Sequence, residues 1–186
     1  MINTSSETPG QSETTGDHQY LIFNLGSESF ALAILQVKEI IEYGQLTEVP
    51  MMPEVVRGVI NLRGSVVPVI DLAIRFWKHP TRIGRRSCII IVELTDTEQH
   101  QVMGIVVDAV NKVTEIAHDD IEPAPAFGSR IRTDFIAGMG KIDDRFVVIL
   151  NAVKVLSVEE LAAISGESLA DRLEDDPQAL NDLPSR

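Results

Sequence analysis

The stretch of residues 55–72 constrains the fold more than any other part of this chain, because its pattern is that of a β-hairpin. Two apolar runs flank the dipeptide Arg63-Gly64, and glycine supplies the positive φ angle that a two-residue hairpin loop requires. A loop of this length pairs Leu62 with Ser65 and places Arg63 at the exposed tip. The stretch holds no group able to do covalent chemistry, so it indicates recognition rather than catalysis.

The same pattern returns eighty residues later without a gap. When residues 138–152 are set against residues 58–72, a Gly-led strand, a polar turn and an apolar strand follow in the same order in both. A short polar residue then comes next, Asp71 in the first copy and Asn151 in the second. Any two hairpins of similar length can look alike over so few positions, which is the alternative. We expect two related β units rather than one large sheet.

Most of the remaining chain also predicts short strands, at residues 20–25, 29–33, 87–93, 101–110 and 112–116. Residues 34–41 fit a turn of helix and a strand equally well. Ser157 and Glu160 form a capping-box pattern that predicts a helix up to Gly166. Many short strands with short helices at the joins indicate a mainly β fold of two small barrels. Aliphatic residues must fill these barrels, because aromatic residues make up only 5% of the chain.

The two ends of the chain differ in composition from its middle. Residues 1–18 are rich in Ser, Thr, Glu and Gly and have few apolar side chains, so we expect a disordered N-terminal tail. Residues 166–186 are acidic and weakly apolar, which predicts an acidic C-terminal tail. A folded domain is therefore expected at residues 19–165.

The charge balance disfavours some partners. Acidic residues outnumber basic ones by 28 to 16, for a net charge of −12, and such a field repels nucleic acid phosphates and anionic lipid. An oligonucleotide-binding barrel would also need a basic face with stacking aromatic residues. The exception is one loop with four cations, either a solvated linker or an anion site: Lys78, Arg82, Arg85 and Arg86.

No pattern in the sequence predicts a catalytic, metal or cofactor site. The four histidines are scattered, without the spacing of a metal motif. The single Cys88 lies in an apolar run, where a thiol normally behaves as a small buried hydrophobe. A small enzyme that uses Cys88 stays as an alternative of a different class, and it would predict alkylation of this thiol in the folded protein, whereas a binding protein predicts protection.

The sequence also predicts a cellular location and an apolar binding surface. Neither a signal peptide pattern nor an apolar run of about eighteen residues occurs, so we expect a cytoplasmic protein that does not insert into membranes. Small barrels seldom expose large apolar patches without a partner. We therefore expect a hydrophobic groove between the two units that could take an apolar helix, and exposed strand edges that could dock on similar barrels.

These motifs, in this order, resemble the CheW family of bacterial chemotaxis adaptors. The resemblance spans Tyr20 to about Ile164, and NLRG followed by VPVIDL is its most specific part. The matching segments are FNLGSESFALAILQVKEII (23–41), VRGVINLRGSVVPVIDL (56–72), MGIVVDAVNKV (103–113), FIAGMGKIDDRFVVILN (135–151) and SVEELA (157–162).

The resemblance implies a fold, a function and partners. The fold would be two five-stranded, SH3-like β-barrels with a hydrophobic groove between them. The function would be that of an adaptor without enzymatic activity or cofactor, which couples transmembrane chemoreceptors to the histidine kinase CheA. Its partners would be the cytoplasmic tips of methyl-accepting receptors, the regulatory domain of CheA and other CheW-like domains. An adaptor of a different array, controlling twitching motility or second-messenger synthesis, fits the sequence as well.

The resemblance also implies where partners would bind. Arg63 and Val113 would fall on the receptor-facing side, and Val37, Glu39 and Gly58 at positions where CheW proteins are sensitive to change. Residue type alone offers plainer interpretations. Both valines fit a core, Gly58 fits close packing, Glu39 fits an ordinary exposed carboxylate, and Arg63 fits a solvated hairpin tip.

Overall fold

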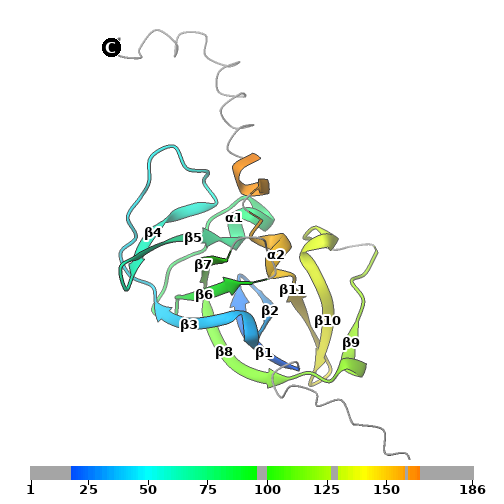
Figure 1. Cartoon of the computed structure of the whole chain (residues 1–186). Coiled ribbons are helices and arrows are strands. Elements are labelled where there is room, and N and C mark those ends of the chain that lie inside the picture. Colours follow the sequence, from blue (N-terminus) through cyan, green and yellow to red (C-terminus); the bar gives the residue numbers. More distant parts are fainter. Residues whose placement is uncertain (1–17, 96–99, 127–129, 158, 164–186) are drawn as a thin grey trace, which may run out of the picture.

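The structure, a computed structural model, describes residues 18–95, 100–126, 130–157 and 159–163 (Figure 1). Except for His18, the two expected tails lie outside these ranges. The fold is mainly β, as the sequence predicts, and its strands form two sheets. The contacts that position the candidate site come from these sheets and from the short helices between them.

The strands in chain order are β1 (Gln19–Leu25), β2 (Glu28–Ala33), β3 (Val37–Glu42), β4 (Val56–Leu62), β5 (Ser65–Asp71), β6 (Cys88–Leu94), β7 (Gln101–Val107), β8 (Ala109–Glu115), β9 (Ile121–Glu122), β10 (Ile136–Ile142) and β11 (Arg145–Leu150). The helices are α1 (Leu72–Trp77) and α2 (Ala152–Val155), with 3₁₀ turns η1 (Ile34–Gln36), η2 (His118–Asp120) and η3 (Thr133–Phe135). Residues 159–163 are also helical.

The two sheets are intertwined along the chain. Sheet A has the strand order β8-β1-β2-β11-β10-β9, and sheet B has the order β3-β6-β7-β5-β4. The chain leaves sheet A after β2, builds all of sheet B and returns to sheet A at β8 (Figure 1). The prediction of two small β units is confirmed, and the two-residue β9 adds a sixth strand to one of them.

The sequence repeat is a repeat in structure. In β4–β5 the pairing of Leu62 with Ser65 is as predicted, and the register shifts between Val56 and Gly58. In β10–β11 the register shifts between Ile136 and Gly138, eighty residues later. The second strand of each hairpin then pairs in parallel, β5 with β7 and β11 with β2. Both hairpins therefore have a register shift at the same position and pair in parallel through their second strand.

Two sequence predictions about element boundaries are settled by the structure. Residues 34–41 contain both options, because the turn η1 leads directly into β3. The predicted strand at residues 101–110 is wrong at its end, since β7 stops at Val107. The backbone N–H of Asp108 donates to Asn24 O at 3.0 Å, and its carboxylate accepts from the Gly26 N–H at 2.6 Å. These bonds hold the bend at which the chain passes from sheet B to sheet A.

One large core joins the two sheets. Buried side chains of both sheets form it, including Phe23, Leu25 and Phe30 of sheet A with Ile90 and Ile105 of sheet B. Each curled sheet also has a smaller cluster of its own. Apolar side chains thus fill much of the contact between the units, where a groove was expected. A recess of about 560 Å³ lies where the β1–β2 turn, α1 and the β7–β8 bend meet.

A buried carboxylate fastens the end of β5 to its surroundings. Asp71 has 0% exposure, and its Oδ1 accepts from the Ala73 N–H at 3.0 Å, which caps the start of α1. The same carboxylate accepts from the Thr81 N–H at 2.9 Å and from the Thr81 hydroxyl at 2.8 Å. Arg57 Nη1 lies 3.6 Å from Oδ2. Asp71 therefore connects β4, α1 and the loop that follows α1.

The predicted C-terminal helix is present where the structure describes it. The N–H of Leu161 donates to Ser157 O at 3.0 Å, so a helical turn starts there, while the predicted stop at Gly166 lies outside the described residues. The Glu160 carboxylate accepts hydrogen bonds from Arg75 and Arg132. It thus joins this helix to the body of the protein, a use that the capping-box pattern did not predict.

Candidate binding surface at the hairpin tip

The β4–β5 hairpin presents Arg63 at its tip. Both loop residues have positive φ, +50° at Arg63 and +87° at Gly64, which is the pattern of a tight hairpin turn matched to the twist of its strands. The Gly64 N–H donates to Asn61 Oδ1 at 2.8 Å and stabilises the turn. The side chain of Arg63 is 72% exposed. The predicted position of Arg63 is confirmed.

Arg63 and Glu39 form a two-pronged ion pair. Arg63 Nη1 lies 2.7 Å from Glu39 Oε1, and Nη2 lies 3.0 Å from Oε2. Glu39 is on β3, at the opposite edge of sheet B from β4. The sheet curls so that the hairpin tip reaches its other edge strand. The interpretation of Glu39 as an ordinary exposed carboxylate is therefore incomplete, because its partner cation is in the same chain.

Gly58 lies against the segment that closes sheet B. Thr47 pairs with Val59 through two backbone hydrogen bonds of 2.9 Å each. Gly58 has a φ of +150°, and a Cβ atom added to it would lie 2.6 Å from Thr47 O. The interpretation of Gly58 as a close-packing glycine is confirmed. The Thr47 segment and the Arg63–Glu39 pair together connect β3 to the far edge of the sheet.

The two valines differ in setting. Val37 opens β3, pairs with Val92 and packs against the shared core, in agreement with the core interpretation. Val113 lies on β8 in sheet A and is 49% exposed, so the core interpretation is wrong for it. The structure thus brings Arg63 and Glu39 together, and it places Val37 and Gly58 elsewhere on sheet B and Val113 on the other sheet.

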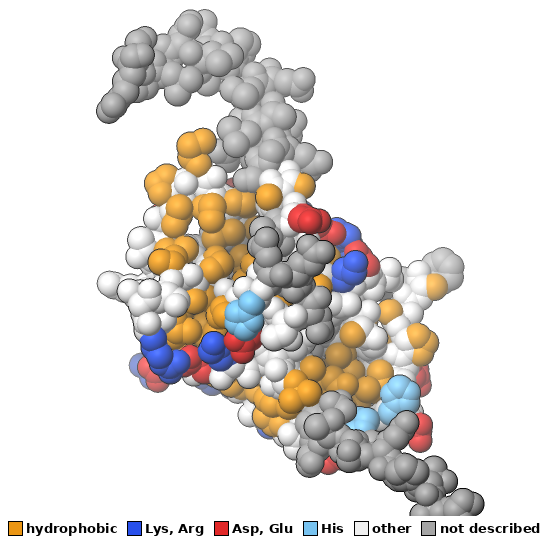
Figure 2. Space-filling model, in the orientation of Figure 1, with side chains coloured by type: hydrophobic (Ala, Val, Ile, Leu, Met, Phe, Trp, Pro, Cys, Tyr) orange, Lys and Arg blue, Asp and Glu red, His pale blue; other side chains and the backbone are white. Residues whose placement is uncertain are grey.

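Three exposed apolar side chains lie on or next to the strands that carry the ion pair. They are Leu35 on η1, Ile40 on β3 and Val66 on β5. Figure 2 shows apolar side chains gathered over sheet B, with charged side chains at the rim. The sequence does not reveal these three, because alternation marks which residues share a face but not which face stays uncovered. The surface can bind a partner through apolar contacts fixed by one charged group.

Cys88 does not have the setting that the sequence predicted. It is the first residue of β6 and only partly buried, and its Sγ lies 3.3 Å from Arg86 O. The expectation of a buried thiol inside a strand is therefore wrong, because the strand starts one residue later than the apolar run. In the described part of the chain, no three side chains of His, Cys, Asp or Glu gather in a way that could hold a metal ion. No helix there is long and apolar enough to span a bilayer.

Comparisons with known proteins agree on one family. Residues 19–160 match the family described as CheW-like domain. The chemotaxis protein CheW of Klebsiella aerogenes is 36% identical over 152 residues, which cover 82% of this chain and 89% of that protein. CheW of Bacillus subtilis is 35% identical over 146 residues, covering 78% and 90%. The crystal structure of the scaffolding protein TtCheW from Thermoanaerobacter tengcongensis matches with a TM-score of 0.69 and 34% identity, over 81% of this chain and 95% of that one.

Proposed function

Because the chain belongs to the CheW family, we propose that it is a chemotaxis adaptor that couples transmembrane chemoreceptors to the histidine kinase CheA. It would be cytoplasmic, without catalytic activity or cofactor, and recruited to membrane-associated receptor arrays. The observation that carries the proposal is the Arg63–Glu39 pair at the hairpin tip, in a sheet whose strands also carry the exposed apolar side chains Ile40 and Val66. Such a surface, one charged group with apolar side chains nearby on the same sheet, suits binding.

An adaptor of this kind acts by linkage. It binds receptor and kinase together, and it transmits a signal only if its binding free energy differs between two states of the kinase. One surface would contact the cytoplasmic tips of receptors and another the regulatory domain of CheA. The two related β units of the chain provide two surfaces of similar construction for these contacts and for other CheW-like domains.

The ion pair prepares Arg63 for a partner. A guanidinium has five N–H donors, and Glu39 takes only two of them. The other donors point to solvent from a side chain whose position is already fixed. Fixing a long side chain before binding lowers the conformational entropy lost in the complex. Glu39 would therefore act as a positioning residue for Arg63 rather than as a contact.

Replacing Arg63 by Glu should weaken receptor binding at least tenfold while changing the free energy of unfolding by less than about 1 kcal/mol. The change removes an exposed cation and places a carboxylate beside Glu39, but it uncovers no buried group. Binding is measured by co-sedimentation with receptor-containing membranes, and stability by urea denaturation. A parallel loss of stability and binding would make Arg63 structural.

A charge swap separates the two roles of the pair. The double variant R63E/E39R restores an ion pair between the same strands but removes the cation from the tip. If Arg63 contacts the receptor, the swap should bind as poorly as Arg63→Glu. Recovery of binding in the swap would show that only the link between β3 and the hairpin matters.

The enzyme alternative is tested through Cys88. Because this thiol is partly exposed, its alkylation would not separate an enzyme from an adaptor. The variant Cys88→Ser does so. We expect it to retain full coupling, measured as receptor-controlled phosphorylation of CheA in the presence of receptor membranes. Loss of kinase control without loss of folding would contradict the adaptor proposal.

The alternative within the family is an adaptor of a different array. The same co-sedimentation decides it, with the candidate CheA and receptors added together. Ternary sedimentation with raised, receptor-controlled kinase activity supports the chemotaxis adaptor. Binding to neither partner would favour an array that controls twitching motility or second-messenger synthesis.

A further inference from the structure

We propose that the acidic C-terminal segment, residues 164–186, docks on the loop at residues 78–86 of the same chain. This loop, called the basic loop below, connects α1 to β6. The proposal goes beyond the adaptor role and does not depend on it. It rests on the charges of the loop, on the bonds that fix the loop, and on the place where the last described helix is attached.

The basic loop carries four cations without partners. The side chains of Lys78, Arg82, Arg85 and Arg86 are exposed, and none of them makes an ion pair within the described part of the chain. Like charges on one short loop repel one another, and this repulsion falls when an anion binds. In a chain of net charge −12, most of the available anions are its own carboxylates.

The backbone of the basic loop is fixed by hydrogen bonds at three places. The Lys78 N–H donates to Ile74 O at 2.9 Å, and Thr81 donates twice to the buried Asp71. The Gly84 N–H donates to Ser87 Oγ at 2.8 Å. The cations are thus presented on a backbone that is already ordered, so an acidic segment would bind without ordering the loop first.

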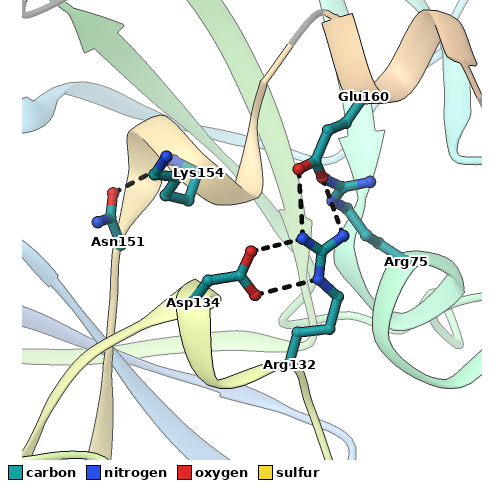
Figure 3. Close-up of polar contacts among 6 residues, drawn as sticks. All are labelled: Arg75, Arg132, Asp134, Asn151, Lys154 and Glu160. Carbon is teal, nitrogen blue, oxygen red and sulfur yellow. Dashed lines mark hydrogen bonds and ion pairs between the residues drawn. The ribbon is translucent and has the colours of Figure 1, made fainter.

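The C-terminal helix is attached to α1, the element that leads into this loop. Figure 3 shows Glu160 between Arg75 and Arg132, with Asp134 on the far side of Arg132. Arg75 Nη2 lies 2.7 Å from Glu160 Oε2, and Arg132 Nη1 lies 3.1 Å from the same oxygen. The neighbouring Leu161 is buried in the shared core. The start of the C-terminal segment is therefore fixed.

The charged groups at this attachment stabilise one another. Burial lowers the pKa of Arg75, and the hydrogen bond that Arg75 donates to Glu160 opposes that shift. Hydrogen bonds from Arg132 hold the pKa of Asp134 below its usual value. Both guanidinium groups also lie over the Phe135 ring, at 4.7 and 4.5 Å from its centroid. Arg75 is on α1, and the basic loop begins three residues later, so the last described helix is attached to the element from which the loop starts.

The C-terminal segment has the charge and the length to reach the loop. Its acids outnumber its two arginines and cluster at residues 174–176, about ten residues past the described helix. An extended chain spans about 3.3–3.6 Å per residue, so about ten residues reach roughly 35 Å. A tethered segment also acts at an effective concentration near the millimolar range. The N-terminal segment joins the protein at β1, away from α1 (Figure 1), and is the less suited occupant.

A paramagnetic label tests the proposal. In the full chain with C88S, which removes the native thiol, a nitroxide is attached at Q178C. We expect about twofold or stronger loss of amide peak intensity at residues 82–86, because a tethered acidic segment is held there most of the time. The turn at Asp143 and Asp144 should keep its intensity. Raising the salt from about 0.1 M to about 1 M shortens the screening length from about 10 Å to about 3 Å and should restore the peaks.

Matched variants make the result decisive. The same label at S12C should leave the basic loop unchanged, and the charge reversal R82E/R85E/R86E should abolish the effect of the label at position 178. The neutral segment E174Q/D175N/D176N should do the same without touching the folded part. The proposal is overturned if the peaks keep their intensity, if both label positions broaden them equally, or if the broadening survives either charge change. It is also overturned if the broadening arises only between labelled and unlabelled copies.

Discussion

Replacing Asp71 by Ala should lower the free energy of unfolding by about 3–5 kcal/mol, the range for removing one partner of a buried charged network. The change removes the cap of α1 and leaves two donors of Thr81 without a partner in a buried site. It also leaves Arg57 next to an empty space where a carboxylate was. Since whole domains have about 5–15 kcal/mol of stability, this variant should be partly unfolded at moderate temperature.

The repeat supplies the control for this prediction. Asn151 holds the equivalent position in sheet A, and its side chain makes one capping bond, to the Lys154 N–H at 3.2 Å. Asn151→Ala should therefore cost only about 1 kcal/mol, the usual effect of losing a helix cap. Urea denaturation of both variants, analysed with a common slope, measures the difference. Equal losses would mean that the bonds to Thr81 contribute nothing beyond the cap.

Replacing Gly58 by Ala should destabilise the protein by about 2–5 kcal/mol, because it combines backbone strain with lost hydrogen bonds. The φ of +150° is rarely adopted by residues with a side chain, and the added Cβ would lie 2.6 Å from Thr47 O. The Thr47 backbone must move, which breaks its two bonds to Val59. Hydrogen exchange of these two amides should speed up more than that of any core strand.

Variants at two other glycines separate the effect of backbone strain from the effect of steric overlap. A Cβ at Gly64 meets nothing within 4 Å although its φ is +87°, so Gly64→Ala should cost about 1–2 kcal/mol from backbone strain alone. A Cβ at Gly138, the repeat position of Gly58, would lie 2.7 Å from an Ile121 methyl group. A side-chain methyl can shift more easily than a backbone carbonyl, and the Cβ at Gly138 would meet the Glu122 carbonyl only at 3.2 Å, so Gly138→Ala should cost less than Gly58→Ala. The interpretation fails if Gly58→Ala is no worse than Gly64→Ala.

The parts of the fold that could be predicted from the sequence are those set by local chemistry. The Arg63-Gly64 dipeptide defines the turn and, through its length, which residues pair, and alternation in the flanking strands defines which residues share a face. The repeat of the hairpin, with Asp71 and Asn151 at matching ends, correctly predicted two related units. In each case neighbouring residues decide the structure, so no knowledge of distant contacts is needed.

The errors come from contacts between distant residues. The end of β7 depends on bonds from Asp108 to the β1–β2 turn, and nothing near Asp108 in the sequence indicates them. The helix α1 was missed for a local reason, because its six residues are too few to show a helical period, although its cap, Asp71, directly precedes it. The candidate site shows the same limit. Both Glu39 and Arg63 were identified through the family resemblance, but their pairing depends on the curl of sheet B.

The passage of the chain from sheet A to sheet B and back has a consequence for biosynthesis. The β1–β2 hairpin leaves the ribosome before the other described strands, and its partners β8 and β11 are made about eighty to more than one hundred residues later. At about 5–20 residues per second, the hairpin waits on the order of 5–20 s with both edges unpaired. Sheet B has all its strands once β7 is complete and can fold in the meantime. During synthesis, the β1–β2 hairpin must therefore stay soluble until the β10–β11 hairpin has been made.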